Sequence, residues 1–203
     1  MITGLERIAQ NKLKYPESKH LNLIHYVNVE NLKGAYKRIN GKKATGTDKV
    51  SKDEYGKDLE ANLNQLVARM KTFSYRPQPT KRVYIPKAGS NKLRPLGIPS
   101  FEDKLVQNIM ADVLSEIYEP IFYDFSYGFR KDRDCHKAIE HLSEMIQRNK
   151  VNYIVDADIK GFFDNVDHKI LMEFLRKEIG DDVFLRYIIR FLKAGIMEHG
   201  KKI

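Results

Sequence analysis

The sequence predicts an α+β fold in which helices dominate and strands are few. Three observations support this class. Apolar residues recur at helical spacing through most of the chain, prolines cluster in one short region, and apolar residues alternate in one later segment. With 203 residues, of which 42% are hydrophobic, the chain can bury a sizeable core. Its 36 Lys and Arg residues outnumber 27 Asp and Glu, and this excess favours a polyanionic partner.

The cysteine count and the hydropathy of the sequence indicate the cellular compartment of the protein. Cys135 is the single cysteine in the sequence, so an intramolecular disulfide and a Cys-based zinc site are both excluded. The sequence contains no apolar run of the length that a signal peptide or a membrane-spanning helix requires. We therefore expect a cytoplasmic protein without a membrane partner.

The first 70 residues predict three helical stretches. Thr3 and Glu6 form a capping-box pattern before a short amphipathic helix that is expected to stop near Pro16. Apolar residues at helical spacing predict a second helix within residues 32–39. A further capping box at Ser51 precedes a third helical stretch, which reaches residue 70.

The next region predicts a hairpin followed by a long helix. Residues 75–100 contain five of the seven prolines and two short apolar runs, one on each side of "AGSN". This pattern is typical of a β-hairpin with prolines at edge positions. Ser100 and Asp103 then mark the start of the strongest helix in the sequence, which Pro120 limits. After a loop, another amphipathic helix runs to about Arg148.

The last 50 residues predict one strand, two helices and part of a hairpin. Apolar residues alternate over residues 151–159, as in a strand. Helical spacing follows over residues 170–179, and Asp182 opens another helix. The final "IMEHGKKI", residues 196–203, is expected to form the first half of a hairpin. We therefore expect an incomplete antiparallel sheet in this part of the chain.

Positive charge is concentrated on the predicted hairpin and its approach. From Ala61 to Phe101 the sequence has eight Lys or Arg residues and no acid. Such a density suits contacts to phosphates, and Tyr75 and Tyr84 could stack on bases or riboses. The alternative is a solvated charged face. The residues predicted to contact RNA are Arg69, Lys71, Arg76, Lys81, Arg82 and Lys92.

Carboxylates follow the predicted strand in "VDADIKGFFDN", residues 155–165. Asp156 and Asp158 share one face of that strand, and Asp158 at its end could hold a hard divalent cation. Asp164 or Asn165 is expected to cap the next helix, and Asp167 is a further candidate.

A phosphohydrolase of the haloacid-dehalogenase type also places Asp-x-Asp after an apolar strand. Such enzymes favour Thr or Val two places after the second Asp, where this chain has Lys160. Their motif also usually comes early in the chain, whereas about 150 residues precede it here. Both departures disfavour this alternative.

Four segments, taken together, resemble one family. "GTDKV", "YIPKAGSNKLRPLGIPSFEDKLVQ", "SYGFRKDRDCHKAI" and "VDADIKGFFDNVDH" stand in the order found in reverse transcriptases encoded by bacterial group II introns, also called intron maturases. The resemblance implies right-hand polymerase-like fingers and a partial palm. Residues 1–45 would be a helical N-terminal extension, residues 46–125 the fingers, and residues 126–203 the finger/palm junction with the first part of the palm.

The resemblance also implies contacts to an incoming nucleotide. Lys87 and Arg94 resemble the residues of the fingers that hold its triphosphate, since Arg grips phosphate oxygens in a fork and Lys supplies a point charge. Phe163 resembles the aromatic gate that abuts the sugar and excludes a 2′-hydroxyl. Arg130, in "SYGFR", would lie near template and nucleotide.

Asp158 resembles the first metal-binding Asp of the family's palm, and the backbone carbonyl of Ile159 would be a further ligand. These residues would be half of a two-metal Mg²⁺ site. The aromatic-Ala-Asp-Asp motif that supplies the other carboxylates is absent from the sequence. "GDDVF", residues 180–184, is expected to cap a helix rather than replace that motif. Lys49 also stands where the family usually has Gly, so we assign Asp48 no role.

The expected function is RNA-directed DNA synthesis combined with maturase activity. The implied partners are group II intron RNA, an RNA template with a DNA primer, and deoxynucleoside triphosphates. The 203 residues alone are expected to bind RNA without completing a catalytic site, and their exposed apolar surface would favour a homodimer. The alternatives are a non-catalytic RNA-binding splicing module and a retron-type reverse transcriptase.

Overall fold

The computed structural model describes residues 4–15, 17–87, 89 and 91–203. Thr3 of the first predicted capping box, Pro16 as the stop of the first helix, and Ala88 and Ser90 of the predicted hairpin turn lie outside these residues. The described residues form a helix-rich α+β fold with a small mixed sheet of four strands, which confirms the predicted class. The elements are α1 Glu6–Lys14, η1 Leu23–Tyr26, α2 Val29–Arg38, α3 Lys52–Gly56, α4 Leu59–Lys71, β1 Thr80–Pro86, β2 Leu93–Ile98, α5 Phe101–Tyr118, α6 Cys135–Arg148, η2 Phe163–Asn165, α7 His168–Glu178, α8 Asp182–Leu192, β3 Ile196–Glu198 and β4 Lys201–Lys202.

Several helices begin at the capping residues that the sequence indicates. The Ser51 hydroxyl accepts a hydrogen bond of 3.1 Å from the backbone N–H of Glu54, and Ser100 accepts one of 3.3 Å from that of Asp103. The third predicted helical stretch is divided at Lys57 into α3 and α4. Asp181 caps α8 with bonds to two backbone N–H groups, which confirms that "GDDVF" opens a helix.

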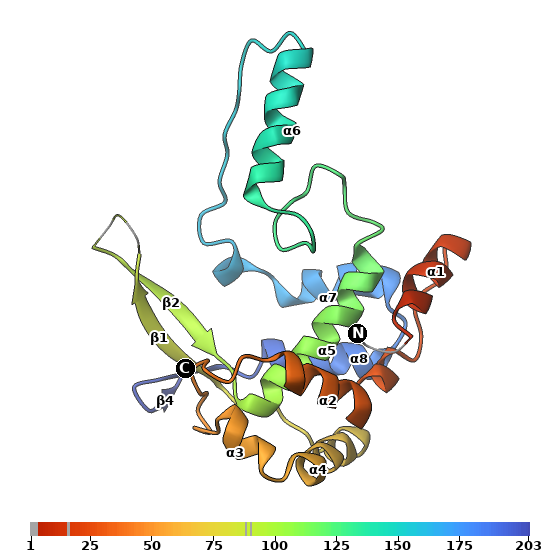
Figure 1. Cartoon of the computed structure of the whole chain (residues 1–203), viewed down its shortest axis with the longest axis vertical. Helices are drawn as coiled ribbons and strands as arrows, with labels where there is room; N and C mark the ends of the chain where they lie inside the picture. The colour runs from red at the N-terminus through yellow and green to blue at the C-terminus, as the bar shows by residue number, and fades with distance from the viewer. Residues whose placement is uncertain (1–3, 16, 88, 90) are drawn as a thin grey trace.

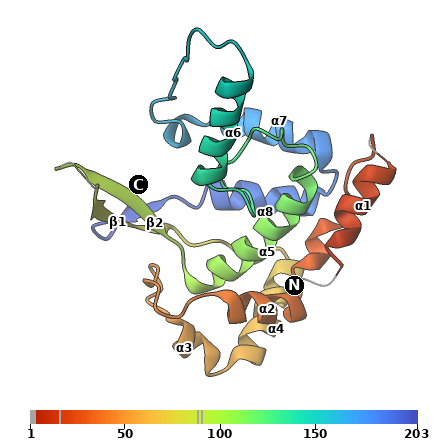
Figure 2. The ribbon, with the colours of Figure 1, turned by 45° about the horizontal axis from the view of Figure 1, so that its top comes forward.

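One hydrophobic core joins the N-terminal helices, α5 and α8. Helix α5 crosses the middle of the molecule, and α1 and α2 pack against it (Figures 1 and 2). Its stripe of Leu105, Val106, Ile109, Val113 and Ile117 is buried, as the apolar spacing predicts. The core extends from α1 to α8, and residues from each of the ranges 1–45, 46–125 and 126–203 contribute to it.

The sheet contains the predicted hairpin but differs from the expected palm sheet. β1 pairs antiparallel with β2, which confirms the hairpin, and it pairs parallel with β3 on its other side. The strand order is β2-β1-β3-β4. The prediction that residues 196–203 form only the first half of a hairpin is wrong, because β3 and β4 pair with each other. His199 and Gly200, both with positive φ, allow this short turn.

The strand predicted over residues 151–159 is wrong. These residues are extended and exposed, and they lie in no sheet among the described residues. Alternating apolar residues indicate which face of a strand would be buried. A strand also needs a neighbouring strand whose backbone can hydrogen-bond with its own. The segment instead returns beside α6, and together α6 and residues 149–160 form an arm that projects from the body (Figure 1).

Helix α6 has the expected amphipathic pattern, yet none of its described residues is buried. Its apolar stripe therefore faces solvent. The exposed residues of this stripe are Ile139, Leu142, Met145 and Ile146. None of the helices that the structure describes is long and apolar enough to cross a membrane.

Candidate nucleic-acid interface

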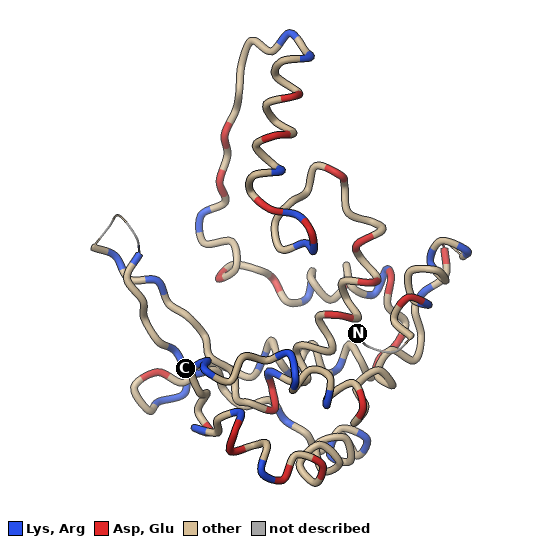
Figure 3. The backbone as a smooth tube through the Cα atoms, viewed as in Figure 1, with Lys and Arg blue, Asp and Glu red and all other residues tan. Residues whose placement is uncertain are grey.

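The β1–β2 hairpin carries cationic side chains away from the body, and Lys and Arg recur along it (Figure 3). The register pairs Lys81 with Ile98 and Ile85 with Arg94, and the N–H of Lys87 donates to the carbonyl of Lys92 over 2.9 Å. Because paired residues share a face, Lys81, Lys87, Lys92 and Arg94 lie on one face of the hairpin.

The other face of the hairpin carries Arg82 and Tyr84. The Tyr84 ring is 45% exposed, so it remains available for stacking, and its hydroxyl donates to the carboxylate of Glu198 in β3. Of the predicted RNA contacts, Lys81 and Lys92 therefore lie on one face of the hairpin and Arg82 on the other. The charge pattern in the sequence does not show this division.

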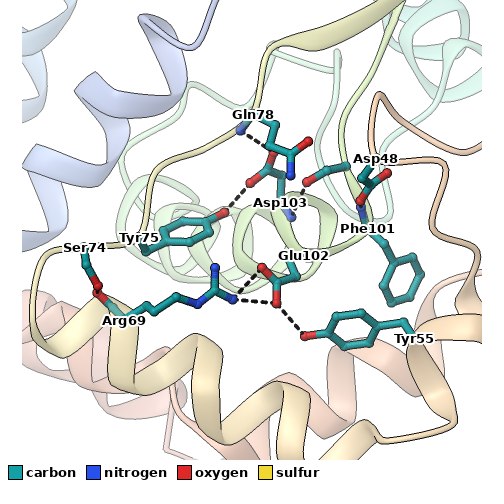
Figure 4. Close-up of polar contacts among 10 residues, drawn as sticks. Asp48, Tyr55, Arg69, Ser74, Tyr75, Gln78, Phe101, Glu102 and Asp103 are labelled. Carbon is teal, nitrogen blue, oxygen red and sulfur yellow. Dashed lines mark hydrogen bonds and ion pairs between the residues drawn. The ribbon is translucent and has the colours of Figure 1, made fainter.

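An ion pair supports the base of the hairpin. One guanidinium nitrogen of Arg69 in α4 lies 2.7 Å from each carboxylate oxygen of Glu102 in α5, and the Tyr55 hydroxyl donates to the same carboxylate over 3.2 Å (Figure 4). Hydrogen bonding to Glu102 raises the pKa of Arg69. Arg69 thus joins two helices, and its contact with RNA stays a prediction.

Tyr75 is a core residue, and the prediction that it stacks on bases is wrong. Its side chain is 2% exposed and its hydroxyl donates to Asp103 (Figure 4). The second carboxylate oxygen of Asp103 accepts from the backbone N–H of Gln78 over 3.0 Å. Burial raises the pKa of Asp103, while the bonds from Tyr75, Ser100 and Gln78 act in the opposite direction. This contact fixes the approach to β1 against α5.

Asp48 has a structural function that the sequence did not indicate. Its carboxylate accepts bonds from the N–H of Phe101 over 3.1 Å and of Val50 over 3.3 Å, so it helps to cap α5 (Figure 4). Lys49 beside it has φ +59, the left-handed region that favours glycine. Asp48 and Phe101 are 53 residues apart, and no local pattern connects them.

Gly46 allows the same loop to approach the start of α5. A Cβ atom at this position would lie 2.5 Å from the carbonyl oxygen of Pro99. The glycine of "GTDKV" therefore lets the backbone of this loop lie close to the backbone at Pro99, in addition to any contact the loop makes with a ligand.

The two other predicted RNA contacts near the base of the hairpin, Arg76 and Lys71, have different surroundings. Arg76 donates to the carbonyl of Phe73 over 2.6 Å and to that of Tyr75 over 3.3 Å. Lys71 is exposed at the last residue of α4. Both stay predictions as RNA contacts, and Arg76 would make that contact from a side chain that already stabilises the turn after α4.

Arg130 organises the loop between α5 and α6. Its guanidinium donates to Glu119 at 2.7 Å and to the carbonyls of Tyr123 and Ser126 at 2.7 and 2.8 Å. Only 5% of its side chain is exposed, and hydrogen bonding to Glu119 raises its pKa. The structure gives Arg130 a folding role, and its contact with template or nucleotide stays a prediction.

Asp158, Ile159 and Phe163 follow one another on an exposed segment. Phe163 is 78% exposed and contacts the ring of Phe162 edge to face. Among the described residues, no group of three His, Cys, Asp or Glu side chains could hold a metal ion. One carboxylate seldom fixes Mg²⁺, so these residues do not by themselves fit a magnesium site.

The caps predicted at Asp164 and Asn165 are wrong. Asp164 and Asn165 lie in η2, where the side-chain amide of Asn165 donates to the carbonyl of Gly161 over 2.7 Å. Asp167, the further candidate, caps α7 with bonds of 2.7 Å and 3.1 Å from Lys169 and Ile170. Asp167 is the cap because helix α7 begins at His168, the residue that follows it.

Residues 85–201 match the family described as "Reverse transcriptase (RNA-dependent DNA polymerase)". This match covers more than half of the chain, and the chain belongs to the reverse transcriptase family. It is also 36% identical over 196 residues to Group II intron-encoded protein LtrA of Lactococcus lactis subsp. cremoris, a match that covers 96% of this chain and 32% of LtrA. The predicted resemblance to group II intron reverse transcriptases is confirmed.

Two further relatives extend the comparison. Protein YkfC of Escherichia coli (strain K12) is 34% identical over 163 residues, which are 79% of this chain and 42% of YkfC. Nuclear intron maturase 1, mitochondrial, of Arabidopsis thaliana is 30% identical over 112 residues, which are 50% of this chain and 15% of that protein. The chain spans about a third of the length of LtrA.

Proposed function

We propose that this chain is part of an RNA-directed DNA polymerase that also binds group II intron RNA and assists splicing and mobility. The observation that carries the proposal is the cationic β1–β2 hairpin, whose flanking helices α4 and α5 are joined by the Arg69–Glu102 ion pair. Membership of the reverse transcriptase family and the similarity to LtrA support it. Residues 1–45 would form the N-terminal extension, residues 46–125 the fingers, and residues 126–203 the junction with the first part of the palm.

The hairpin face that carries Lys81, Lys87, Lys92 and Arg94 is the proposed surface for phosphates. Lys87 and Arg94 lie toward the tip on opposite strands, an arrangement that suits the triphosphate of a deoxynucleotide. Lys81, nearer the base, would contact the backbone of an RNA template paired with a DNA primer. Arg82 and Tyr84 would meet RNA on the other face, through charge and stacking.

Asp158 and the carbonyl of Ile159 are proposed ligands of the family's Mg²⁺, and Phe163 is the proposed neighbour of the sugar. When bound, the metal would supply electrostatic stabilisation of phosphoryl transfer. Among the described residues no group of three His, Cys, Asp or Glu side chains could hold the metal, so we propose that the 203 residues alone bind RNA without extending a primer.

RNA binding tests the role of the hairpin. The salt dependence of affinity for a structured RNA is measured in filter binding for the parent chain, for Lys81→Gln with Lys87→Gln, and for Lys37→Gln on α2. Each lost phosphate contact lowers the slope of log affinity against log salt by about 0.7 to 0.9. The hairpin variant is expected to lose about two contacts and the α2 control none. A salt-independent affinity would refute the proposal.

Primer extension separates polymerase activity from RNA binding alone. Extension by the 203-residue chain would contradict its proposed inactivity. In an active polypeptide that continues past residue 203, Asp158→Ala is expected to abolish DNA synthesis and to leave RNA affinity unchanged. Unchanged synthesis would exclude Asp158 as a ligand and would favour a non-catalytic splicing module for this region.

A further inference from the structure

A pocket of about 520 Å³ lies where three segments distant in sequence meet. It is formed by the loop at residues 46–49, the start of β1, and the turn between β3 and β4. Its charged or titratable lining residues are Lys49, Lys81, Arg82 and His199. No local sequence pattern indicates this pocket, because its three walls come from segments that lie far apart in the sequence.

The position of the pocket is fixed by backbone pairing. Lys81 of β1 is the parallel partner of Met197 in β3, which places the β3–β4 turn beside the start of the hairpin. The hydroxyl of Thr47 donates to Gln78 over 3.1 Å or to the carbonyl of Pro79 over 3.2 Å, which holds the loop against the same strand. The walls are therefore parts of one hydrogen-bonded unit.

The pocket is strongly cationic. Its lining residues include two lysines, an arginine and a histidine, and no acid. Two carboxylates flank lining residues in the sequence. Asp48 accepts hydrogen bonds from the backbone N–H groups of Phe101 and Val50. Glu198 accepts one from the hydroxyl of Tyr84. Positive charges gathered around one cavity repel one another, and an anion bound there would reduce that repulsion.

Backbone strain accompanies this arrangement. Lys49 and His199 both have positive φ, +59 and +47, a region that side chains other than Gly and Asn rarely adopt. Such a conformation persists where the surrounding structure imposes it. Both residues line the same pocket.

We propose that this pocket binds a phosphate group, carried either by the backbone of an RNA strand or by a nucleoside triphosphate. Lys and Arg recognise phosphate through charge-assisted hydrogen bonds, and the volume admits a phosphate with part of its sugar. The RNA source of this phosphate rests on the proposed function. The pocket extends the interface from the hairpin to the β3–β4 turn.

NMR of the 203-residue chain tests the pocket directly. Three probes are titrated at matched ionic strength: inorganic phosphate, a deoxynucleoside triphosphate and a short single-stranded RNA. The amide signals of Gly46 and Gly200 are expected to move with at least one probe. In Lys49→Gln combined with His199→Asn, affinity for that probe is expected to fall about tenfold or more. Lys43→Gln, which lies before that loop and does not line the pocket, is the control and is expected to bind as the parent does.

The outcome separates this inference from the proposed function. The probe that binds most tightly at Gly46 and Gly200 identifies the source of the phosphate. Movement with inorganic phosphate and no RNA affinity anywhere would support the pocket and contradict the RNA-binding function. If no probe moves these signals, or if the double variant binds as the parent does, the pocket is not a phosphate site.

Discussion

The guanidinium of Arg69 in α4 holds both carboxylate oxygens of Glu102 in the first turn of α5, at 2.7 Å each. This pair joins the helix that precedes the basic hairpin to the helix that follows it. A residue that a charge pattern assigns to RNA is therefore part of the support on which the hairpin stands.

Replacing Arg69 is expected to destabilise the fold more than it weakens RNA binding. Arg69→Gln should lower the free energy of unfolding by about 1 kcal/mol, a value reduced by the partial exposure of the pair. Lys81→Gln, an exposed hairpin control, should leave stability unchanged and weaken RNA binding. Urea denaturation and filter binding measure the two effects. A stable Arg69→Gln variant with weak RNA binding would assign Arg69 to the interface.

The Tyr75–Asp103 contact predicts a pH-dependent stability. Tyr75→Phe removes a hydrogen bond to a buried carboxylate, which should cost about 1 to 3 kcal/mol at neutral pH. The bond lowers the pKa of Asp103, so its loss raises that pKa further above the unfolded value. A raised folded pKa favours the folded state at low pH, and this contribution is lost as the pH rises through it.

The cost of Tyr75→Phe should therefore be larger at pH ~7 than at pH ~4, as urea denaturation at both pH values would show. Tyr84→Phe, which removes the hydroxyl of an exposed tyrosine, is the control and should have a small effect. An equal cost for Tyr75→Phe at both pH values would contradict the prediction, because it would mean that the Tyr75 hydroxyl does not change the pKa of Asp103.

Gly46 is expected to tolerate no side chain. In Gly46→Ala the new Cβ would lie 2.5 Å from the Pro99 carbonyl oxygen, so the loop must move away from α5, at a cost of about 1 to 3 kcal/mol. Gly128→Ala is a matched control, because it has no neighbouring atom within 4 Å. Thermal unfolding compares them. Equal midpoints for both variants would contradict the close approach.

The exposed stripe of α6 predicts self-association. Contiguous apolar surface of this kind is buried in most proteins, and two copies of the chain could cover it by forming a homodimer. Leu142→Glu should shift sedimentation toward the monomer without changing stability, since Leu142 is 50% exposed. Glu140→Gln on the same helix is the control. A parent chain that stays monomeric at high concentration would contradict this prediction.

Local signals predicted the elements whose causes are local. Ser51 and Ser100 cap their helices through bonds three residues away, and the stripe of α5 is buried as its period indicates. The hairpin follows from its two apolar runs and the prolines around them. Each of these features depends on contacts between residues that are close together in the sequence.

Features that depend on distant partners were missed. Tyr75 looks like an exposed aromatic among cations until Asp103 and Tyr187 are placed beside it. Asp48 gains its role from a helix 53 residues later, and β3 from a strand 116 positions earlier in the parallel register. Residues 151–159 have the pattern of a strand, but no described strand lies beside them to complete the pairing.

The parallel pairing of Thr80 with Ile196 has a consequence for how the protein is made. During synthesis the hairpin emerges from the ribosome well before β3, so one edge of β1 stays open until β3 appears. Long-range parallel pairings form slowly, and open edges recruit other chains. Folding of this region is therefore completed only after β3 has emerged, and the cations along the hairpin would help to keep nascent chains apart until then.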